Sequence, residues 1–463
     1  MSLKAKYQYT HFIYPFVVDE KKYTDFIYKL NKNPKLWKLK IHDQKEDETM
    51  YNFFLPYMRK FLFPTLFWSS VNKKEIKRMG IYTKSSILSK LTCVEFDYNL
   101  SNIKTGKMKD NNVDTIGFDI TKIKLICFMP GICFLDIRAE IDEKEEYIDF
   151  NKILDFNHTF RKLTPRAIKS FINENKIKAK SIDKLETISN LILSITKDFE
   201  VSSLEKIYYD KMFTYSYTCI DGWEKPEDFK KFKNEFLKYQ YVMSSNNSGV
   251  FSNNCSRLND NMYSRWGYSM FGFSRESLVV LVSDKEKYNI TRLPYVFENT
   301  YMYMFLLAFY QRIRLLNFSQ DLMENNRSMV KKLNKELTNF THFSWFSQIT
   351  NSEHGMDIWK CLQNSFELEL LYEEVHKEYA EYYEFVATQV QGRINSLLIL
   401  IYIVSVIFSG LQILTNMFDL KDMENFVIIT MVATILIYPI YSIIRYIKSK
   451  YEVRSFYIKH FGK

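Results

Sequence analysis

The sequence predicts an α+β fold: a mixed α/β cytosolic domain, a long stalk α-helix and a C-terminal hairpin of two transmembrane helices. Three observations lead to this prediction. Short aromatic or β-branched runs alternate with amphipathic segments across residues 1–290. Apolar side chains then recur every three or four residues from Leu368 to Val404. Two uncharged segments of membrane-spanning length complete the pattern.

The composition is that of a folded protein with a small membrane part. The chain has 463 residues, of which 46% are hydrophobic and 25% charged, so intrinsic disorder is excluded. The mean hydropathy of −0.26 excludes a protein with many membrane spans. The six cysteines form no C-x-x-C pair, so neither a zinc site nor a disulfide framework is indicated. The net charge of +10 suits an acidic membrane surface, a nucleic acid or a phosphate-bearing ligand.

Residues 1–290 are expected to form a sensing body, with a possible subdivision near residue 160. Runs rich in aromatic and β-branched residues predict strands at 7–18, 93–98, 122–129, 132–140, 211–220 and 278–283. Amphipathic patterns predict helices at 22–30, 51–67, 150–160, 182–199 and 226–241. The polar segment 244–261 predicts a flexible loop.

Residues 291–392 are expected to be helical. The apolar run 301–316 is interrupted by Arg312 and Arg314 too soon for a membrane span, so it predicts a buried helix. One long helix is then predicted from about residue 357 to about residue 416, which at ~1.5 Å per residue is about 90 Å. Such a helix must cover its apolar side, either by oligomerisation through a seam or by folding back on its own domain.

Two transmembrane helices are predicted within residues 393–445, at 394–416 and 426–444. No charged residue occurs between Arg393 and Asp419, or between Glu424 and Arg445. Each gap is long enough for the ~20 residues that a hydrocarbon core requires. The connecting loop is acidic and the tail 446–463 is basic. The positive-inside bias therefore predicts a multi-pass protein of the cell inner membrane with both termini in the cytoplasm.

A polar stripe marks one face of the first predicted span. Its members, which share one side of the helix, are Asn395, Leu398, Tyr402, Ser405, Ser409, Gln412 and Asn416. Polar groups in lipid are costly unless they meet protein or water. One interpretation is a pore lined by this face, where hydroxyl and amide oxygens replace part of an ion's hydration shell. The other is a small-residue contact between helices around Ser409 and Gly410, without conduction.

The order of these parts resembles the CorA family of divalent-cation channels and transporters: one long helix continuous with the first span, a short outer loop, a second span and a basic tail. The resemblance implies a homopentamer with a funnel-shaped cytosolic assembly, in which magnesium or another divalent cation is the permeant or regulatory ion. The family's Gly-Met-Asn triplet at the end of the first span is absent. The corresponding place reads Thr415, Asn416 and Met417, so only Asn416 carries over.

The missing triplet and the enlarged N-terminal part are similar to a CorA-like branch associated with type III CRISPR defence. That resemblance implies a membrane effector switched by a nucleotide second messenger that joins S-adenosylmethionine to AMP. A nucleotide needs aromatic faces for its base and cationic donors for its phosphate. The segment 256–277 offers Arg257, Arg265, Trp266, Tyr268 and Arg275. The alternative is a strand entry with ordinary surface arginines.

An acidic run precedes the first span. In an assembly of stalks, Glu367, Glu374, Glu378 and Glu381 could form carboxylate rings that bind divalent cations, because hard cations prefer oxygen ligands. The alternative is a solvated helix face. The sequence contains no H-E-x-x-H or G-x-S-x-G motif, so an enzyme is not expected.

We therefore expect an oligomeric membrane channel. In the favoured hypothesis it is a nucleotide-gated effector of antiviral defence that disrupts the ion balance across the membrane. The alternatives are a constitutive magnesium or divalent-cation transporter and a membrane-anchored binding protein without conduction. The expected partners are the lipid membrane, further copies of the chain and a small nucleotide, with no direct binding of nucleic acid and no firmly bound cofactor.

Overall fold

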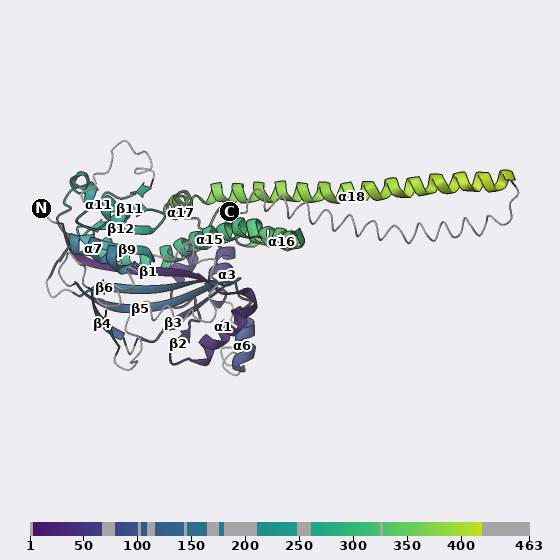
Figure 1. The fold of residues 1–463 in the computed structure, drawn as a ribbon. Coiled ribbons are helices and arrows are strands. Elements are labelled where there is room, and N and C mark those ends of the chain that lie inside the picture. Colours follow the sequence, from purple (N-terminus) through teal and green to yellow (C-terminus); the bar gives the residue numbers. More distant parts are fainter. Residues whose placement is uncertain are drawn as a thin grey trace. The chain divides into compact units, whose positions relative to one another are not determined.

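The computed structural model describes residues 3–66, 79–100, 103–108, 116–142, 146–163, 176–179, 211–247, 261–324 and 327–418. The chain divides into two compact units, Met1–His376, called the body below, and Lys377–Lys463. The body is a mixed α/β structure built on one sheet. Helix α18 (Leu368–Phe418) begins in the body and continues into the second unit (Figure 1). The predicted α+β fold with a long C-terminal apolar helix is thus confirmed.

The centre of the sheet is strand β1 (Lys4–Val17), which pairs antiparallel with β6 (Ile132–Ile141) and β9 (Phe213–Ile220). Strand β12 (Ser277–Ser283) adds to β9 in parallel, so the sheet is mixed. The strand order is β10-β11-β12-β9-β1-β6-β5-β3-β2. The remaining bounds are β2 Trp37–Leu39, β3 Cys93–Tyr98, β4 Ile103–Met108, β5 Ile116–Phe128, β7 Ile148–Asp149, β8 Lys176–Ala179, β10 Met262–Tyr263 and β11 Ser269–Phe273. The sheet therefore joins both sides of the expected subdivision near residue 160.

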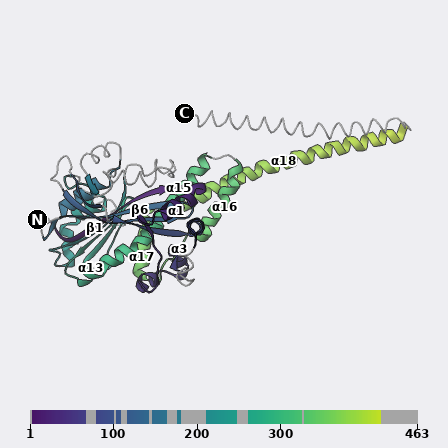
Figure 2. The same cartoon turned by 90° about the horizontal axis from the view of Figure 1, so that it is seen from below.

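Helices cover both faces of this sheet, so its central strands are buried on both sides. On one face, the ring of Phe12 in β1 lies 4.2 Å from Phe160 of α7 (Phe150–Phe160). On the other, Tyr215 in β9 stacks on Phe297 at 4.1 Å between ring centroids. Helices α13 (Lys287–Thr291) and α17 (Glu353–Phe366) lie on this second side (Figure 2). The other helices are α1 Glu20–Lys32, α2 Glu48–Phe53, α3 Pro56–Leu62, α6 Ile81–Leu88, α11 Lys233–Gln240, α14 Leu293–Val296, α15 Met302–Glu324 and α16 Arg327–Phe343.

Most strands and helices predicted for the described residues are present. The strand 93–98 and the helix 150–160 agree with β3 and α7, and α15 is the predicted buried helix. All side chains from Tyr303 to Tyr310 are buried, because α15 packs on the sheet and against α16 and α17. The predicted helix 182–199, the second span 426–444 and the tail 446–463 lie outside the described residues.

Three predicted helices differ from the structure. The helix predicted at 51–67 is two helices, because the chain is extended at Phe54 and Leu55 before Pro56 starts α3. The helix predicted at 226–241 is a 3₁₀ turn (Pro226–Lys231) followed by α11. The long helix predicted from residue 357 is interrupted at Glu367, which adopts a left-handed conformation with φ of 53°. Helix α17 therefore ends at Phe366, and α18 begins at Leu368.

Candidate functional site

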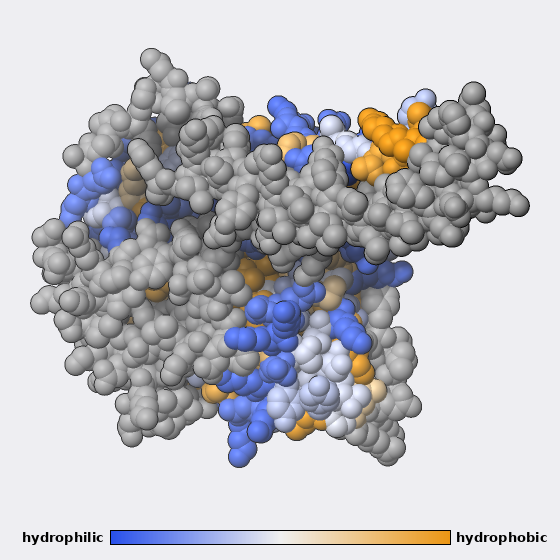
Figure 3. Space-filling model, turned by 45° about the vertical axis from the view of Figure 1, so that its right-hand side comes forward, coloured by the Kyte–Doolittle hydropathy of each residue, from blue (hydrophilic) through white to orange (hydrophobic). Residues whose placement is uncertain are grey.

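Helix α18 is long and apolar enough to cross a membrane, and within the described residues it is the one helix that meets this description. The candidate span covers Leu368–Gly410, and none of its most apolar window is buried within the chain. Figure 3 shows the hydrophobic side chains that gather on this exposed part of the surface. Exposed isoleucine and leucine on a folded chain indicate a lipid or protein partner. Helix α18 is therefore a candidate membrane-spanning helix by its length and composition.

Polar residues, with Leu398 as the exception, follow α18 along a seam with alternating spacings of three and four residues. The seam consists of Glu374, Lys377, Glu381, Glu384, Thr388, Gln391, Asn395, Leu398, Tyr402, Ser405, Ser409, Gln412 and Asn416. These spacings average 3.5 residues, which is the period that keeps one face of a helix toward its partners in a left-handed supercoil. Every seam side chain from Glu374 to Gln412 is exposed in the single chain. The predicted stripe is thus the last part of a longer continuous face.

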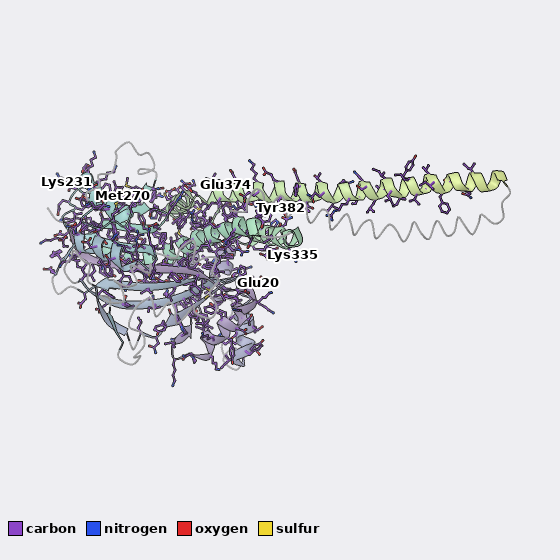
Figure 4. The ribbon with its side chains drawn as sticks, viewed as in Figure 1. Glu20, Lys231, Met270, Lys335, Glu374 and Tyr382 are labelled. Atoms are coloured by element: carbon purple, nitrogen blue, oxygen red, sulfur yellow. The ribbon has the colours of Figure 1, made fainter. Side chains whose placement is uncertain are left out.

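The structure places the predicted site residues of α18 in two groups. The stripe from Asn395 to Gln412 lies on the seam, and Asn416 follows at the same period, its side chain being outside the described part. Among the acidic candidates, Glu374 and Glu381 lie on the seam, whereas Glu378 does not. Figure 4 shows the side chains of α18, including Glu374, projecting from the helix. Glu384, which belongs to the predicted acidic run, also lies on the seam, whereas Thr388 and Gln391 were not predicted, although extending the period of the stripe toward the N-terminus would have found them.

Glu367 is the fourth acidic candidate, and it lies between α17 and α18 rather than on either helix. Its carboxylate forms an ion pair with Arg275. The neighbouring carbonyl of Phe366 accepts a hydrogen bond from Arg312 of α15. The ring of Phe366 is buried and stacks on Phe309 with centroids 5.6 Å apart. These contacts fix the position at which the helical direction changes before α18.

Among the predicted nucleotide-binding residues, Arg265 and Arg275 contact the α17 region, whereas Tyr268 contacts Glu224. Arg265 lies 3.1 Å from a carboxylate oxygen of Glu353 and 3.8 Å from one of Asp357, both on α17. Trp266 is 59% exposed, and the Arg265 guanidinium lies 5.6 Å from the centre of its ring. The hydroxyl of Tyr268 donates a hydrogen bond to the carbonyl of Glu224 at 3.1 Å.

Arg257 lies outside the described residues, so its place in this group remains a prediction. The two described arginines, Arg265 and Arg275, thus each hold an acidic residue of the α17 region. An anionic ligand that bound either arginine would have to compete with that carboxylate.

A buried charged cluster in the body was not predicted from the sequence. The carboxylate of Glu95 in β3 lies 2.9 Å from the ammonium of Lys124 and 3.1 Å from that of Lys40. It also accepts a hydrogen bond from Tyr303 and lies 3.6 Å from His42 Nε2. Burial alone would raise the pKa of the Glu95 carboxyl, but Lys124 and Lys40 hold it well below its usual range.

These groups neutralise one another, which is the condition for burying charge in a core. Among the described residues no group of three or more His, Cys, Asp or Glu side chains is arranged to hold a metal ion. The acidic rings predicted for α18 would form only between copies of the chain, so they stay a prediction.

No protein-family model matches the sequence, and no curated protein is significantly similar to it.

Proposed function

We propose that the protein is an oligomeric membrane channel in which α18 of each copy lines the pore. The observation that carries the proposal is the seam, because one helix presents a face that is polar from Glu374 to Gln412 except at Leu398, while its other sides in the apolar segment are mostly hydrophobic. Lipid would cover the apolar sides, whereas a polar face needs water or protein. Several copies arranged around an axis provide both environments.

The composition of the seam favours a hydrated lumen over a dry helix contact. Stable coiled coils place apolar side chains at the positions that repeat every 3.5 residues. Here Asn395, Ser405, Ser409 and Gln412 occupy them within the apolar segment, and their oxygens can replace part of an ion's hydration shell. A ring of helices leaves these groups in contact with water. The resemblance to CorA proteins suggests that the ring contains five copies.

We further propose that a ligand bound by the body gates this channel. Arg265 contacts α17 and Arg275 contacts Glu367, and both of these partners precede α18 in the chain. A ligand that altered these contacts would therefore act on the start of the pore helix. Following the CorA resemblance, the favoured ligand is the messenger that joins S-adenosylmethionine to AMP. The protein would then be an effector of type III CRISPR defence in the cell inner membrane.

A constitutive transporter of magnesium or another divalent cation is the second candidate. It is favoured by the acidic members of the seam, because Glu374 and Glu381 share the face of the stripe. Rings of carboxylates concentrate divalent cations at the mouth of a pore. Both candidates share the α18 pore and differ in what opens it.

The first test is divalent-cation flux into liposomes that contain the purified full-length protein, with and without the messenger. Flux that requires the messenger supports the gated effector, whereas flux that is present without it and suppressed by internal magnesium supports the transporter.

Gln412→Leu combined with Asn416→Leu should lower the flux at least tenfold. Ile407→Leu is the matched control, because Ile407 lies on the opposite side of α18 from the seam. Unchanged flux in the double variant would leave α18 as a membrane anchor only.

A further inference from the structure

Two buried cysteines face each other across neighbouring strands of the sheet. Cys127 of β5 and Cys133 of β6, called the cysteine pair below, are directly opposed in the antiparallel ladder. Both are free thiols with no exposed surface. Opposed residues of antiparallel strands have Cα atoms about 4.5–5.5 Å apart. Disulfide bonds usually join Cα atoms about 4.4–6.8 Å apart, so the backbone already holds the cysteine pair at a bonding separation.

Both thiols of the cysteine pair lie on one face of the sheet, because opposed residues of a ladder point to the same side. They belong to the apolar core that also contains Tyr23 and Phe26 of α1. The hydroxyl of Tyr23 is buried without a hydrogen-bond partner. Burial raises the pKa of Tyr23 well above its usual value, and the thiols of the cysteine pair raise it further. The cysteine pair and Tyr23 therefore form one buried cluster beneath α1.

Cys93 of β3 is a third buried thiol close by, but it is placed differently. It is opposed to Phe128 of β5 rather than to Cys127, so its side chain points to the other face of the sheet. On that face, Phe128 stacks on Tyr310 of α15 with ring centroids 5.0 Å apart. Cys93 thus shares the burial of the cysteine pair without sharing its geometry, which makes it a matched control.

Burial keeps the cysteine pair unreactive while the fold is closed. Burial raises the pKa of the Cys127 thiol well above its usual value, and the interaction with the Cys133 side chain raises it further. The thiol is therefore protonated at neutral pH, whereas the thiolate is the reactive form. The turn that joins the two strands is accessible, since Met129 is 41% exposed. Local opening at this turn admits a small oxidant and lets the thiols ionise.

We propose that the cysteine pair is a redox-responsive site, which a small disulfide such as oxidised glutathione converts into a disulfide between Cys127 and Cys133. One thiolate of the pair attacks a sulfur atom of oxidised glutathione, whose sulfur–sulfur bond breaks, and one reduced glutathione leaves. The second thiolate attacks the protein sulfur of this mixed disulfide and releases a second reduced glutathione. The protein thereby loses two protons and two electrons, and the oxidised glutathione gains them.

The disulfide would act on the part of the sheet that supports α15. On the face opposite the cysteine pair, Phe128 of β5 stacks on Tyr310, and the ring of Phe134 of β6 lies 5.3 Å from that of Phe309. A bond between β5 and β6 at this point restricts the unfolded chain and so stabilises the two strands against opening. The inference concerns the body alone and does not depend on the proposed channel.

The test exposes the purified full-length protein in detergent to mixtures of oxidised and reduced glutathione. Acid quenching, denaturation, alkylation with N-ethylmaleimide and trypsin digestion without reductant follow. The cysteine pair lies in a single tryptic peptide, residues 125–138, because Lys124 precedes it and Arg138 ends it. We expect mass spectrometry to show this peptide unalkylated and two hydrogen atoms lighter than its reduced form. This fraction should grow with the proportion of oxidised glutathione and disappear after treatment with dithiothreitol.

Cys93 should remain fully alkylated in the same samples, because no thiol is opposed to it. Complete alkylation of Cys127 and Cys133 at every glutathione ratio would overturn the inference. A mixed disulfide with glutathione that never resolves, or a cross-link to the peptide that contains Cys93, would overturn it as well.

A second measurement separates the effect of the fold from that of the short separation in sequence. The same titration is repeated in concentrated guanidinium chloride. Half closure of the native protein should need about tenfold less oxidised glutathione, because only the fold holds the two cysteines opposite each other. Cys93→Ala should leave the native midpoint unchanged. A native midpoint equal to or higher than that of the denatured chain, or one that Cys93→Ala shifts, would refute the site.

Discussion

The body and the apolar segment of α18 differ in where they place their polar and apolar groups. In the body, aromatic side chains pack together across the sheet, and a buried charge such as Glu95 is surrounded by Lys124, Lys40 and Tyr303. In α18 the large apolar residues Ile399, Ile407 and Ile413 are exposed, and most polar residues of the apolar segment lie on the seam. The body buries a large core within one chain, whereas α18 leaves many large apolar side chains exposed among the described residues.

This difference predicts that variants of the body change folding and that variants of α18 change assembly and flux. The largest effect is expected for Glu95→Gln, which removes the carboxylate that pairs with the buried ammonium of Lys124 and the half-buried ammonium of Lys40. Loss of one partner from a buried ion pair costs about 3–5 kcal/mol in the free energy of unfolding. Denaturant unfolding followed by tryptophan fluorescence measures it, with Glu227→Gln as the exposed control. A change below about 0.5 kcal/mol would contradict the account of this cluster.

The pH dependence of folding should depend on His42, which lies beside the same cluster. Burial lowers the pKa of His42 to about 4, although the nearby Glu95 carboxylate opposes this effect. A histidine held neutral in the fold stabilises it fully above the ordinary pKa of about 6.5, and this contribution is lost as the pH falls from there to 4. We expect the free energy of unfolding to drop by about 3 kcal/mol over this interval.

His42→Phe should flatten that part of the pH profile, because the titrating group is gone. Denaturant unfolding measured at several pH values between 4 and 7 checks this in both proteins. An equally steep decline in the variant would assign the pH dependence to other groups.

The two regions also differ in how far the sequence could predict them. Runs rich in aromatic and β-branched residues predicted β1 and β9, because a strand buried on both faces is a nearly continuous apolar run. The partners of Glu95 could not be inferred, because Lys40 and Tyr303 are 55 and 208 residues away in sequence. The break before α18 was equally hidden, since a glutamate occupies the left-handed position at which glycine is the usual residue.

The period of the seam, by contrast, can be read from the sequence alone. A period of 3.5 residues is a local property, so it needs no knowledge of distant contacts. The full length of the seam was not predicted. The acidic residues near Glu381 and the stripe near Ser405 differ in chemistry and were interpreted as two separate features. Helix α18 gives them one common face.

A smaller effect is expected from the charges on that face. Glu381→Gln combined with Glu384→Gln should lower the preference for cations over anions several-fold, because rings of carboxylates at a pore mouth attract cations. The reversal potential across a planar bilayer with a salt gradient measures this preference. Glu378→Gln removes the same kind of charge outside the seam and should leave the reversal potential unchanged. Equal shifts in both variants would remove the seam from the ion pathway.

The smallest effect is expected at Gly410, which lies next to the seam residue Ser409 but outside the seam. A side chain added at Gly410 would meet no atom of the described residues within 4 Å. If the seam lines the pore, Gly410→Leu should change the flux by less than about twofold, whereas Ser409→Leu should lower it strongly, because only the latter narrows and dries the lumen. If small residues instead hold the helices together, Gly410→Leu should dissociate the oligomer, since close helix packing tolerates little added volume. Light scattering on the detergent-solubilised protein and liposome flux, measured on the same two variants, separate these outcomes.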